Sequence, residues 1–431
     1  MNCVPGLQSV THRWLLLGCM IAISGCGMPE SESADRRDEP EYDLRYVLTP
    51  NPADGTVDVR LTLRQPRNLL REVSFRIDQR ISDVRGDGTV QIDDEGVSWQ
   101  PPPRGGTLEW NALVQHERDV GAFDALLGPD WGIFRAEDVI PRARTRSLKG
   151  AWSNTTMAFK LPPGWSVVTE YSSLRDPIRV QRDDRRFDQP TGWIAMGTLG
   201  VRRDTITDVR VAIAAPEGHG ARRLDMLALL NWTLPELMEV LPDSLSRLTV
   251  VTAGDPMWRG GLSAPASLYV HKDRPLISEN GTSALLHEVM HVALSIRAED
   301  GYDWIIEGLA EFYSIELLRR GKAISQRRAE RAFVQQAEWA RDATTLCGGV
   351  STGPTTALAV TVFQALDQEL AAATDNAHSL DSLLPVISGQ RMDLDKLAAL
   401  SSDIAGSVPD ALHIDNLPGC LSIAAENARS D

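Results

Sequence analysis

Apolar and polar residues alternate with a period of two through much of the first half of the chain. The pattern is clear at residues 56–63 and 71–77, and it returns at 157–161 and 207–213. Such alternation is typical of strands that bury one face and expose the other. Proline- and glycine-rich connections separate these segments. We therefore predict a β-rich domain from residue 41 to residue 215.

The period changes after residue 215. Residues 222–240 are apolar at helical spacing, while 248–252 and 267–271 are short apolar runs that predict buried strands. Most of the chain after residue 280 has a helical pattern, which includes the segments 357–373 and 392–400. The predicted fold class is α+β multidomain, with an all-β domain followed by a mostly helical domain at 216–431.

Length and composition agree with a folded protein of more than one domain. The chain has 431 residues, of which 42% are hydrophobic and 24% are charged. These proportions are typical of globular proteins. The net charge of −15 argues against nucleic acid as a partner, because a phosphate backbone needs a basic surface.

The N-terminal segment predicts a targeting signal. An apolar run at residues 14–23 is long enough for a signal peptide and too short to span a bilayer. The run ends in Ile23-Ser24-Gly25-Cys26, which resembles the lipobox of bacterial lipoproteins. The resemblance implies removal of residues 1–25 and attachment of a lipid to Cys26. The alternative is an ordinary secretory signal in which Cys26 is incidental.

The residues after this signal predict an acidic tether. Residues 26–40 are polar and rich in acidic side chains, as suits a spacer between a membrane surface and a folded body. Gly27 is not the aspartate that such lipoproteins use for inner-membrane retention. The expected location is therefore the bacterial cell envelope, on the periplasmic face of the outer membrane, with the N-terminal lipid in the membrane.

Two cysteines remain once the signal is removed and Cys26 is lipidated. They are Cys347 and Cys420. In an oxidising compartment such a pair can form a disulfide. Two buried free thiols are the alternative, and the sequence leaves both open.

The strongest chemical signal is a pair of histidines on one predicted helix. His287 and His291 stand four residues apart, so both imidazoles project from the same side of the helix toward one ion. Zinc is commonly bound by neutral imidazole nitrogens, and its catalytic sites keep one position for water. Glu288 follows the first histidine, where it can take a proton from zinc-bound water. This spacing predicts a zinc site with Glu288 as general base.

A second acidic helix follows at residues 303–313. It contains Glu307 and, one turn later, Glu311. A carboxylate from this helix would complete a site of two histidines and one glutamate. The two motifs together, His287-Glu288-Val-Met-His291 and Trp304-Ile-Ile-Glu307-Gly308, resemble the aminopeptidase N and glycyl aminopeptidase families of gluzincins.

The resemblance implies a thermolysin-like zinc peptidase domain after a β-rich domain. It also implies that Glu307 is the third ligand of one zinc ion, because Glu307 occupies the family's Trp-x-x-Glu-Gly position. The spacing departs from the family, since only fifteen residues separate His291 from Glu307 and nineteen separate it from Glu311. We choose Glu307 and expect Glu311 to orient a ligand histidine, with Glu311 as the alternative ligand.

Two family features are absent. The stretch that begins at Gly260 and Gly261 resembles the strand that lies beside the substrate, but Ser263 stands where the family has the glutamate that binds a free α-amine. The family's oxyanion-stabilising tyrosine is also missing from residues 355–358. Tyr313 is expected to pack beside the Glu307 helix, and His378 and His413 are candidates for the missing donor.

Two functions follow from these residues. The first is a zinc-dependent metallopeptidase, possessing aminopeptidase-like features, that hydrolyses peptide bonds in peptide or protein substrates at the envelope. The intact Glu288 favours this hypothesis, because a structural zinc site has no use for a general base. The alternative is a catalytically weak zinc-binding lipoprotein that acts as a scaffold or binding protein, which the missing anchor and tyrosine favour.

Overall fold

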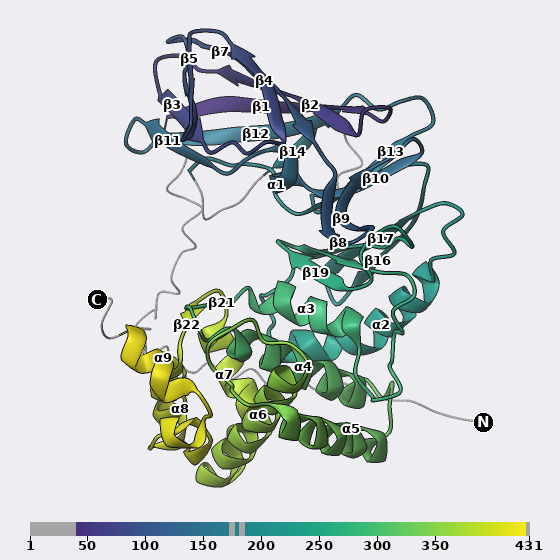
Figure 1. Ribbon diagram of the computed structural model, residues 1–431, viewed down its shortest axis with the longest axis vertical. Coiled ribbons are helices and arrows are strands. Elements are labelled where there is room, and N and C mark those ends of the chain that lie inside the picture. Colours follow the sequence, from purple (N-terminus) through teal and green to yellow (C-terminus); the bar gives the residue numbers. More distant parts are fainter. Residues whose placement is uncertain (1–39, 172–176, 181–185, 428–431) are drawn as a thin grey trace, which may run out of the picture. The chain divides into compact units, whose positions relative to one another are not determined.

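The computed structural model describes residues 40–171, 177–180 and 186–427. The predicted signal, its lipid-attachment residue Cys26 and nearly all of the tether lie outside the described residues. The described chain from Pro40 onward is one compact unit. Figure 1 shows its strands and helices along the sequence.

The first part of this unit contains two packed sheets. The larger sheet has the strand order β14-β12-β1-β2-β7-β4, and the smaller sheet has the order β11-β3-β6-β5. Alternate residues of these strands are buried in one shared apolar cluster, which explains the period of two in the sequence. The strands are β1 (Glu41–Asn51), β2 (Thr56–Arg64), β3 (Leu70–Phe75), β4 (Ile81–Gly86), β5 (Thr89–Asp93), β6 (Gly96–Gln100), β7 (Gly105–Leu113), β11 (Ala143–Ser147), β12 (Trp152–Phe159) and β14 (Ile178–Val180).

A third sheet follows, with the order β13-β15-β10-β9-β8. The short helix α1 (Ala136–Val139) comes directly after its strand β10. The strands are β8 (His116–Asp119), β9 (Ala122–Leu127), β10 (Trp131–Arg135), β13 (Ser166–Thr169) and β15 (Trp193–Gly197).

A fourth, mixed sheet carries the site. Its order is β16-β17-β18-β20-β19, with β17, β18 and β20 parallel to one another and β19 antiparallel at the edge. The helix α2 (Arg223–Val240) connects β17 to β18. The strands are β16 (Leu199–Ile206), β17 (Val209–Pro216), β18 (Arg247–Val251), β19 (Gly261–Ala264) and β20 (Ser267–Val270).

Both faces of this fourth sheet are covered. Ile213 and Val250 belong to the apolar cluster of the helices, whereas their neighbours Ala214 and Val251 pack with the third sheet. All five residues from 248 to 252 are buried, as expected for a strand of a sheet that is covered on both faces. The backbone N–H of Trp193 on β15 also donates to the Ser267 hydroxyl at 2.9 Å, which ties the third sheet to β20.

The boundary predicted between residues 215 and 216 falls inside this sheet. β16 and β17 precede it in the sequence, yet β17 pairs with β18 from the other side of it. The strand predicted at 207–213 begins only at Val209, because Thr207 and Asp208 form the turn of the β16–β17 hairpin with positive φ angles. The change of period at residue 216 therefore marks the end of a strand within a sheet.

Helices dominate the remainder of the chain. α3 lies against β19 and α4, and α4 lies against α6 (Figure 1). The predicted helices at 357–373 and 392–400 correspond to α6 and α8, which begin at Pro354 and Leu394. The elements are α3 (Ala284–Leu294), β21 (Arg297–Ala298), α4 (Asp303–Arg320), α5 (Gln326–Trp339), α6 (Pro354–Ala373), α7 (Leu380–Ile387), β22 (Arg391–Met392), α8 (Leu394–Ala405) and α9 (Cys420–Asn427).

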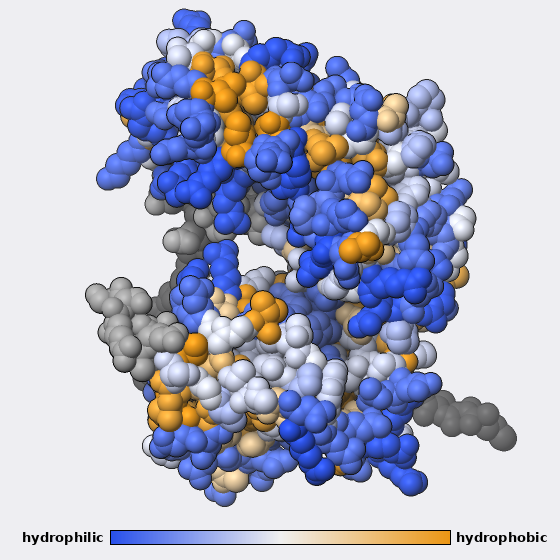
Figure 2. All heavy atoms as spheres, in the orientation of Figure 1, coloured by the Kyte–Doolittle hydropathy of each residue, from blue (hydrophilic) through white to orange (hydrophobic). Residues whose placement is uncertain are grey.

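Among the described residues, no helix combines the length and apolarity needed to cross a membrane. The face drawn in Figure 2 is predominantly hydrophilic, and its apolar side chains gather in separate patches.

Candidate metal centre

The helix α3 places the two histidines. The hydroxyl of Ser283 caps its first turn by accepting a hydrogen bond from the backbone N–H of Leu286 at 3.3 Å. Ser295 ends the helix in a left-handed conformation. Apolar residues of the helix are buried in the helical core, so the face that carries His287 and His291 is fixed in orientation.

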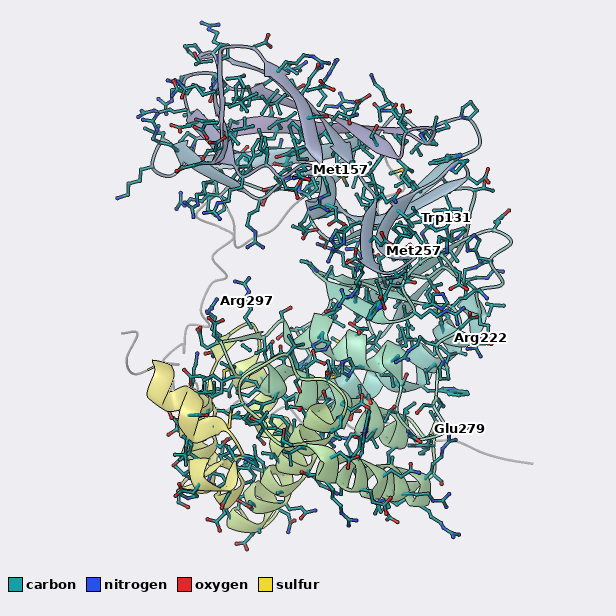
Figure 3. The ribbon with its side chains drawn as sticks, viewed as in Figure 1. Trp131, Met157, Arg222, Met257, Glu279 and Arg297 are labelled. Carbon is teal, nitrogen blue, oxygen red and sulfur yellow. A yellow bond between two sulfur atoms is a disulfide. The ribbon has the colours of Figure 1, made fainter. Side chains whose placement is uncertain are left out.

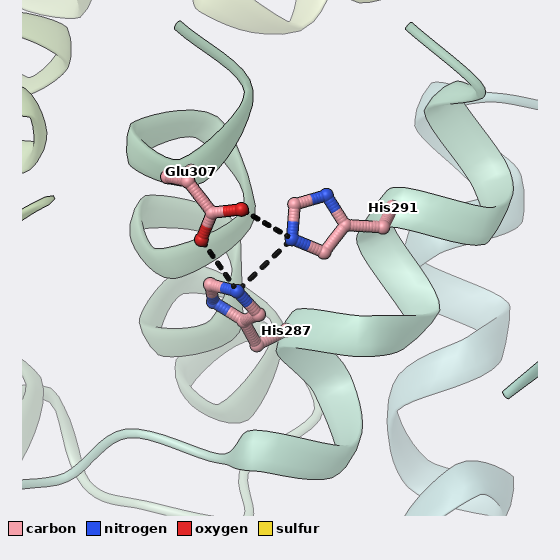
Figure 4. A group of neighbouring side chains, drawn as sticks. All are labelled: His287, His291 and Glu307. Atoms are coloured by element: carbon pink, nitrogen blue, oxygen red, sulfur yellow. Dashed lines mark hydrogen bonds and ion pairs between the residues drawn. The ribbon is translucent and has the colours of Figure 1, made fainter. Parts of the chain in front are cut away.

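The helix α4 places the carboxylates. Gly308 has no room for a side chain, because an added Cβ would lie 2.5 Å from the Cβ of Ala359 and 2.9 Å from the ring of Phe363 on α6. This close approach holds α4 against α6 while the other side of α4 contacts α3. Glu307 directly precedes that glycine and points toward the histidines (Figure 4).

Three side chains converge at this point. The Nε2 atoms of His287 and His291 lie 3.0 Å apart. Oε2 of Glu307 lies 3.2 Å from the first Nε2, and Oε1 lies 3.4 Å from the second. Ligands at 2.0–2.1 Å from a tetrahedral zinc ion are about 3.3 Å apart. The observed separations therefore match those around one zinc ion.

The chemistry of the donor atoms also fits a cation. Two imidazole nitrogens and a carboxylate that face one another can serve together as ligands of one cation. Burial, together with the charge of His287, lowers the pKa of His291 to about 4. Burial also tends to lower the pKa of His287, but its hydrogen bonds to Glu307 and Glu311 outweigh burial and raise it to about 10.

Glu311 contacts the His287 ring on the side away from Glu307. Its Oε2 is 3.1 Å from Nδ1 of His287, the ring nitrogen that faces away from Glu307. Its Oε1 accepts a hydrogen bond from the Gln336 side chain at 3.2 Å. A carboxylate on Nδ1 keeps the proton there and leaves Nε2 free for a metal. The structure thus groups Glu307 with the two Nε2 atoms and puts Glu311 on Nδ1 of His287.

Glu288 lies between α3 and the edge strand β19. It is 8% exposed, and burial raises its pKa to about 7. The positive charge of His287 opposes this rise, as do Arg274 and a hydrogen bond from the Ser263 backbone N–H. A carboxylate whose pKa lies near neutrality is suited to both accepting and returning a proton.

The predicted substrate strand is β19. A Cβ on Gly261 would lie 2.6 Å from Oε1 of Glu288, so glycine is required for this approach of strand to helix. A Cβ on Gly260 would collide with the ring of Trp258 at 1.9 Å. Ser263 is the exposed residue of the strand. The strand's outer edge is unpaired within the described residues, and extended peptides can pair with such an edge.

Tyr313 and the two predicted oxyanion donors, His378 and His413, have partners elsewhere. The Tyr313 hydroxyl donates to Asp381 at 2.7 Å, and that tyrosine is almost wholly buried. The ring of His378 hydrogen-bonds to Ser382, and the half-exposed ring of His413 lies nearest Asp410. No hydrogen bond joins these side chains to the metal ligands within the described ranges.

The structure adds Asp303 to the surroundings of the site. Burial raises its pKa, and the negative charge of Glu307 one turn along α4 raises it further. Its Oδ2 accepts a hydrogen bond from the Ser351 backbone N–H at 2.8 Å, which ties the loop before α6 to the start of α4. The spacing of four residues between Asp303 and Glu307 was a signal in the sequence for this proximity.

Cys347 and Cys420 form a disulfide. The bond connects the loop before α6 to the first residue of α9. In the same loop, the backbone N–H of Gly348 donates to the Gly301 carbonyl at 2.9 Å, two residues before α4 begins. The disulfide thus ties the C-terminal helix to the loop that contacts the start of the ligand-bearing helix.

Among solved structures, the chain is similar to a crystal structure of an aminopeptidase N family protein from Idiomarina loihiensis. The TM-score is 0.59, and the match covers 89% of this chain and 75% of that chain. At 14% sequence identity, this similarity establishes a shared fold alone. The sequence matches no protein-family model and no curated protein.

Proposed function

We propose that the protein is a gluzincin-type zinc metallopeptidase with a thermolysin-like catalytic domain after its β-rich part. The observation that carries this proposal is the convergence of His287, His291 and Glu307 beside the buried carboxylate of Glu288. The fold that the chain shares with an aminopeptidase N family protein supports it.

The three converging side chains would hold the zinc ion. Bound zinc would polarise a carbonyl group and increase the acidity of water. Glu288 accepts a proton from the attacking water at its carboxylate and then delivers that proton to the leaving amine. The β19 edge aligns the peptide backbone beside Glu288, and Glu311 holds the His287 ring in the tautomer that leaves Nε2 unprotonated.

A catalytically weak zinc protein that acts as a scaffold is the second candidate. Two features favour it, namely the exposed Ser263 in place of an anionic anchor and the absence of a tyrosine at residues 355–358. The burial of Glu288 at the centre favours the peptidase, because a scaffold has no need of a proton acceptor with a raised pKa.

The test combines metal analysis with digestion of a peptide library. We expect about one zinc ion per chain, cleavage by the wild-type protein and loss of cleavage in Glu288→Ala. Glu279→Ala is the matched control, because this exposed glutamate lies in the loop before α3 (Figure 3). Zinc without cleavage would favour the scaffold, and absence of zinc would contradict the ligand assignment.

We also propose that the protein is anchored in the bacterial envelope through a lipid on Cys26. The lipobox-like Ile23-Ser24-Gly25-Cys26 supports this location, and a disulfide is typical of oxidising compartments. Labelling with a radioactive fatty acid tests it. We expect the wild-type protein to incorporate label and Cys26→Ser to remain unlabelled, whereas equal labelling of both would refute the attachment site.

A further inference from the structure

The strand beside Glu288, β19, has no acidic residue to bind a substrate amine. Ser263 is exposed on β19, and its neutral hydroxyl cannot neutralise a positively charged amine. Its backbone N–H is already used, because it donates to Glu288. The charge of other nearby residues must therefore decide which substrates are favoured.

A turn at the end of β20 brings Arg274 to this side. The backbone N–H of His271 donates to the Gly260 carbonyl at 3.0 Å, next to the glycine that touches Glu288. The N–H of Arg274 donates to the His271 carbonyl at 3.0 Å and closes the turn. The backbone of Arg274 is thereby attached to the end of the substrate strand.

A second arginine lies beside the first. The guanidinium of Arg222, which immediately precedes α2, donates to the Arg274 carbonyl at 3.3 Å. Figure 3 labels Arg222 near that end of α2. Both arginines are exposed. They come from distant parts of the sequence, and only the fold brings them together.

These two arginines differ from the other cations of the same loops. Arg259 is paired with Asp255 at 2.6 Å, and Lys272 is paired with Asp273 at 2.8 Å. Within the described ranges, neither Arg222 nor Arg274 has a carboxylate within ion-pair distance. Arg274 is thus without a carboxylate partner and is joined through the β20 turn to the end of the strand beside Glu288.

We propose that Arg274, supported by Arg222, forms an anionic subsite beside Glu288 that selects peptides with a carboxylate close to the scissile bond. The inference rests on the proposed function, since it takes a peptide to be the occupant of the cleft. A guanidinium binds a carboxylate through parallel hydrogen bonds, which gives both charge and geometric selection. The carboxylate comes from an acidic side chain or from the peptide's C-terminus.

Peptide binding to zinc-loaded Glu288→Gln protein tests the subsite without turnover. The probes are acetylated, amidated pentapeptides that differ by one Glu or Gln at each position in turn. A second set has neutral side chains and a free or amidated C-terminus. We expect one Glu peptide, or the free C-terminus, to bind about tenfold more tightly than its neutral partner. The two sets distinguish the source of the carboxylate.

Further variants in the same background assign the preference to a residue. Arg274→Ala should make each pair bind equally, and Arg274→Glu should reverse the preference. Arg259→Ala is the control, because this exposed arginine is already paired. Equal binding in the parent protein, a preference that survives Arg274→Ala, or no binding at all would overturn the subsite. Digestion of the neutral peptides by the wild-type protein reports separately on peptidase function.

Discussion

Glu288 shows how one position in the fold sets the chemistry of a side chain. Burial between α3 and β19 raises its pKa to about 7, while His287, Arg274 and the Ser263 N–H limit the rise. The carboxylate must be ionised to accept a proton from water. The activity of the protein should therefore depend on the titration of this one residue.

The first prediction is a pH dependence of kcat/KM. Because the base works only when ionised, kcat/KM should rise with pH up to about 7 and fall about tenfold per pH unit below that pKa. Glu288→Gln should reduce kcat by about 10²-fold or more at every pH, with zinc retained. Steady-state kinetics between about pH 5 and about pH 9 measure both effects. A rate independent of pH across the acidic range would contradict this role.

Glu307 and Glu311, both on α4, should differ in their effect on metal binding. Glu307→Gln removes a predicted ligand, whereas Glu311→Gln removes only the carboxylate that faces Nδ1 of His287. We expect Glu311→Gln to weaken zinc binding by about 10–100-fold and Glu307→Gln to weaken it further. Competition with a zinc chelator measures the two affinities. The reverse order would identify Glu311 as the ligand, as the longer spacing in the sequence allows.

At the scale of elements, the site depends on two close approaches that glycine permits. Gly308 lets α4 lie against α6, and Gly261 lets β19 lie against Glu288 on α3. The two histidines and the proposed general base share one helix, but the proposed third ligand and the proposed substrate strand come from other elements. Their mutual positions therefore depend on how closely these backbones approach.

Gly261→Ala should impair catalysis more than metal binding. The new Cβ would lie 2.6 Å from Oε1 of Glu288, so either the strand or the carboxylate must move. We expect kcat/KM to fall by about tenfold or more, because a small displacement of a catalytic group is costly, while zinc content is preserved. Gly349→Ala is the matched control, since its Cβ would meet no atom within 4 Å. Equal activity of the two variants would show that β19 tolerates displacement.

At the scale of the whole molecule, the disulfide limits the freedom of the C-terminal region. Cys347 and Cys420 are separated by 73 residues, and both are buried. A cross-link that closes a loop of this length reduces the entropy of the unfolded chain, which stabilises the fold.

Replacing both cysteines by alanine should lower the free energy of unfolding by about 2–4 kcal/mol. Urea denaturation of the zinc-loaded protein, with and without a reducing agent, measures this change. The reduced wild-type protein should unfold at the same urea concentration as the double variant. If the reducing agent left the wild-type midpoint unchanged, the disulfide would make no contribution.

Patterns in the sequence predicted the helices and strands whose formation depends on residues close together along the chain. The apolar spacing around His287 predicted α3, and the period of two at residues 56–63 predicted β2. Local patterns do not show which strands pair when the strands are distant in the sequence. The β16–β17 hairpin has the pattern of the preceding strands, but hydrogen bonds to β18 place it in the following sheet.

The sequence by itself determined that His287 and His291 share a face of one helix, because residues four apart on a helix lie one above the other. It left Glu307 and Glu311 as alternatives, since spacing along the chain does not fix the angle at which a second helix approaches the first. Only the tertiary structure decided which carboxylate faces Nε2 and which faces Nδ1. It also brought Arg222 and Arg274 together, through contacts between segments that no local pattern connects.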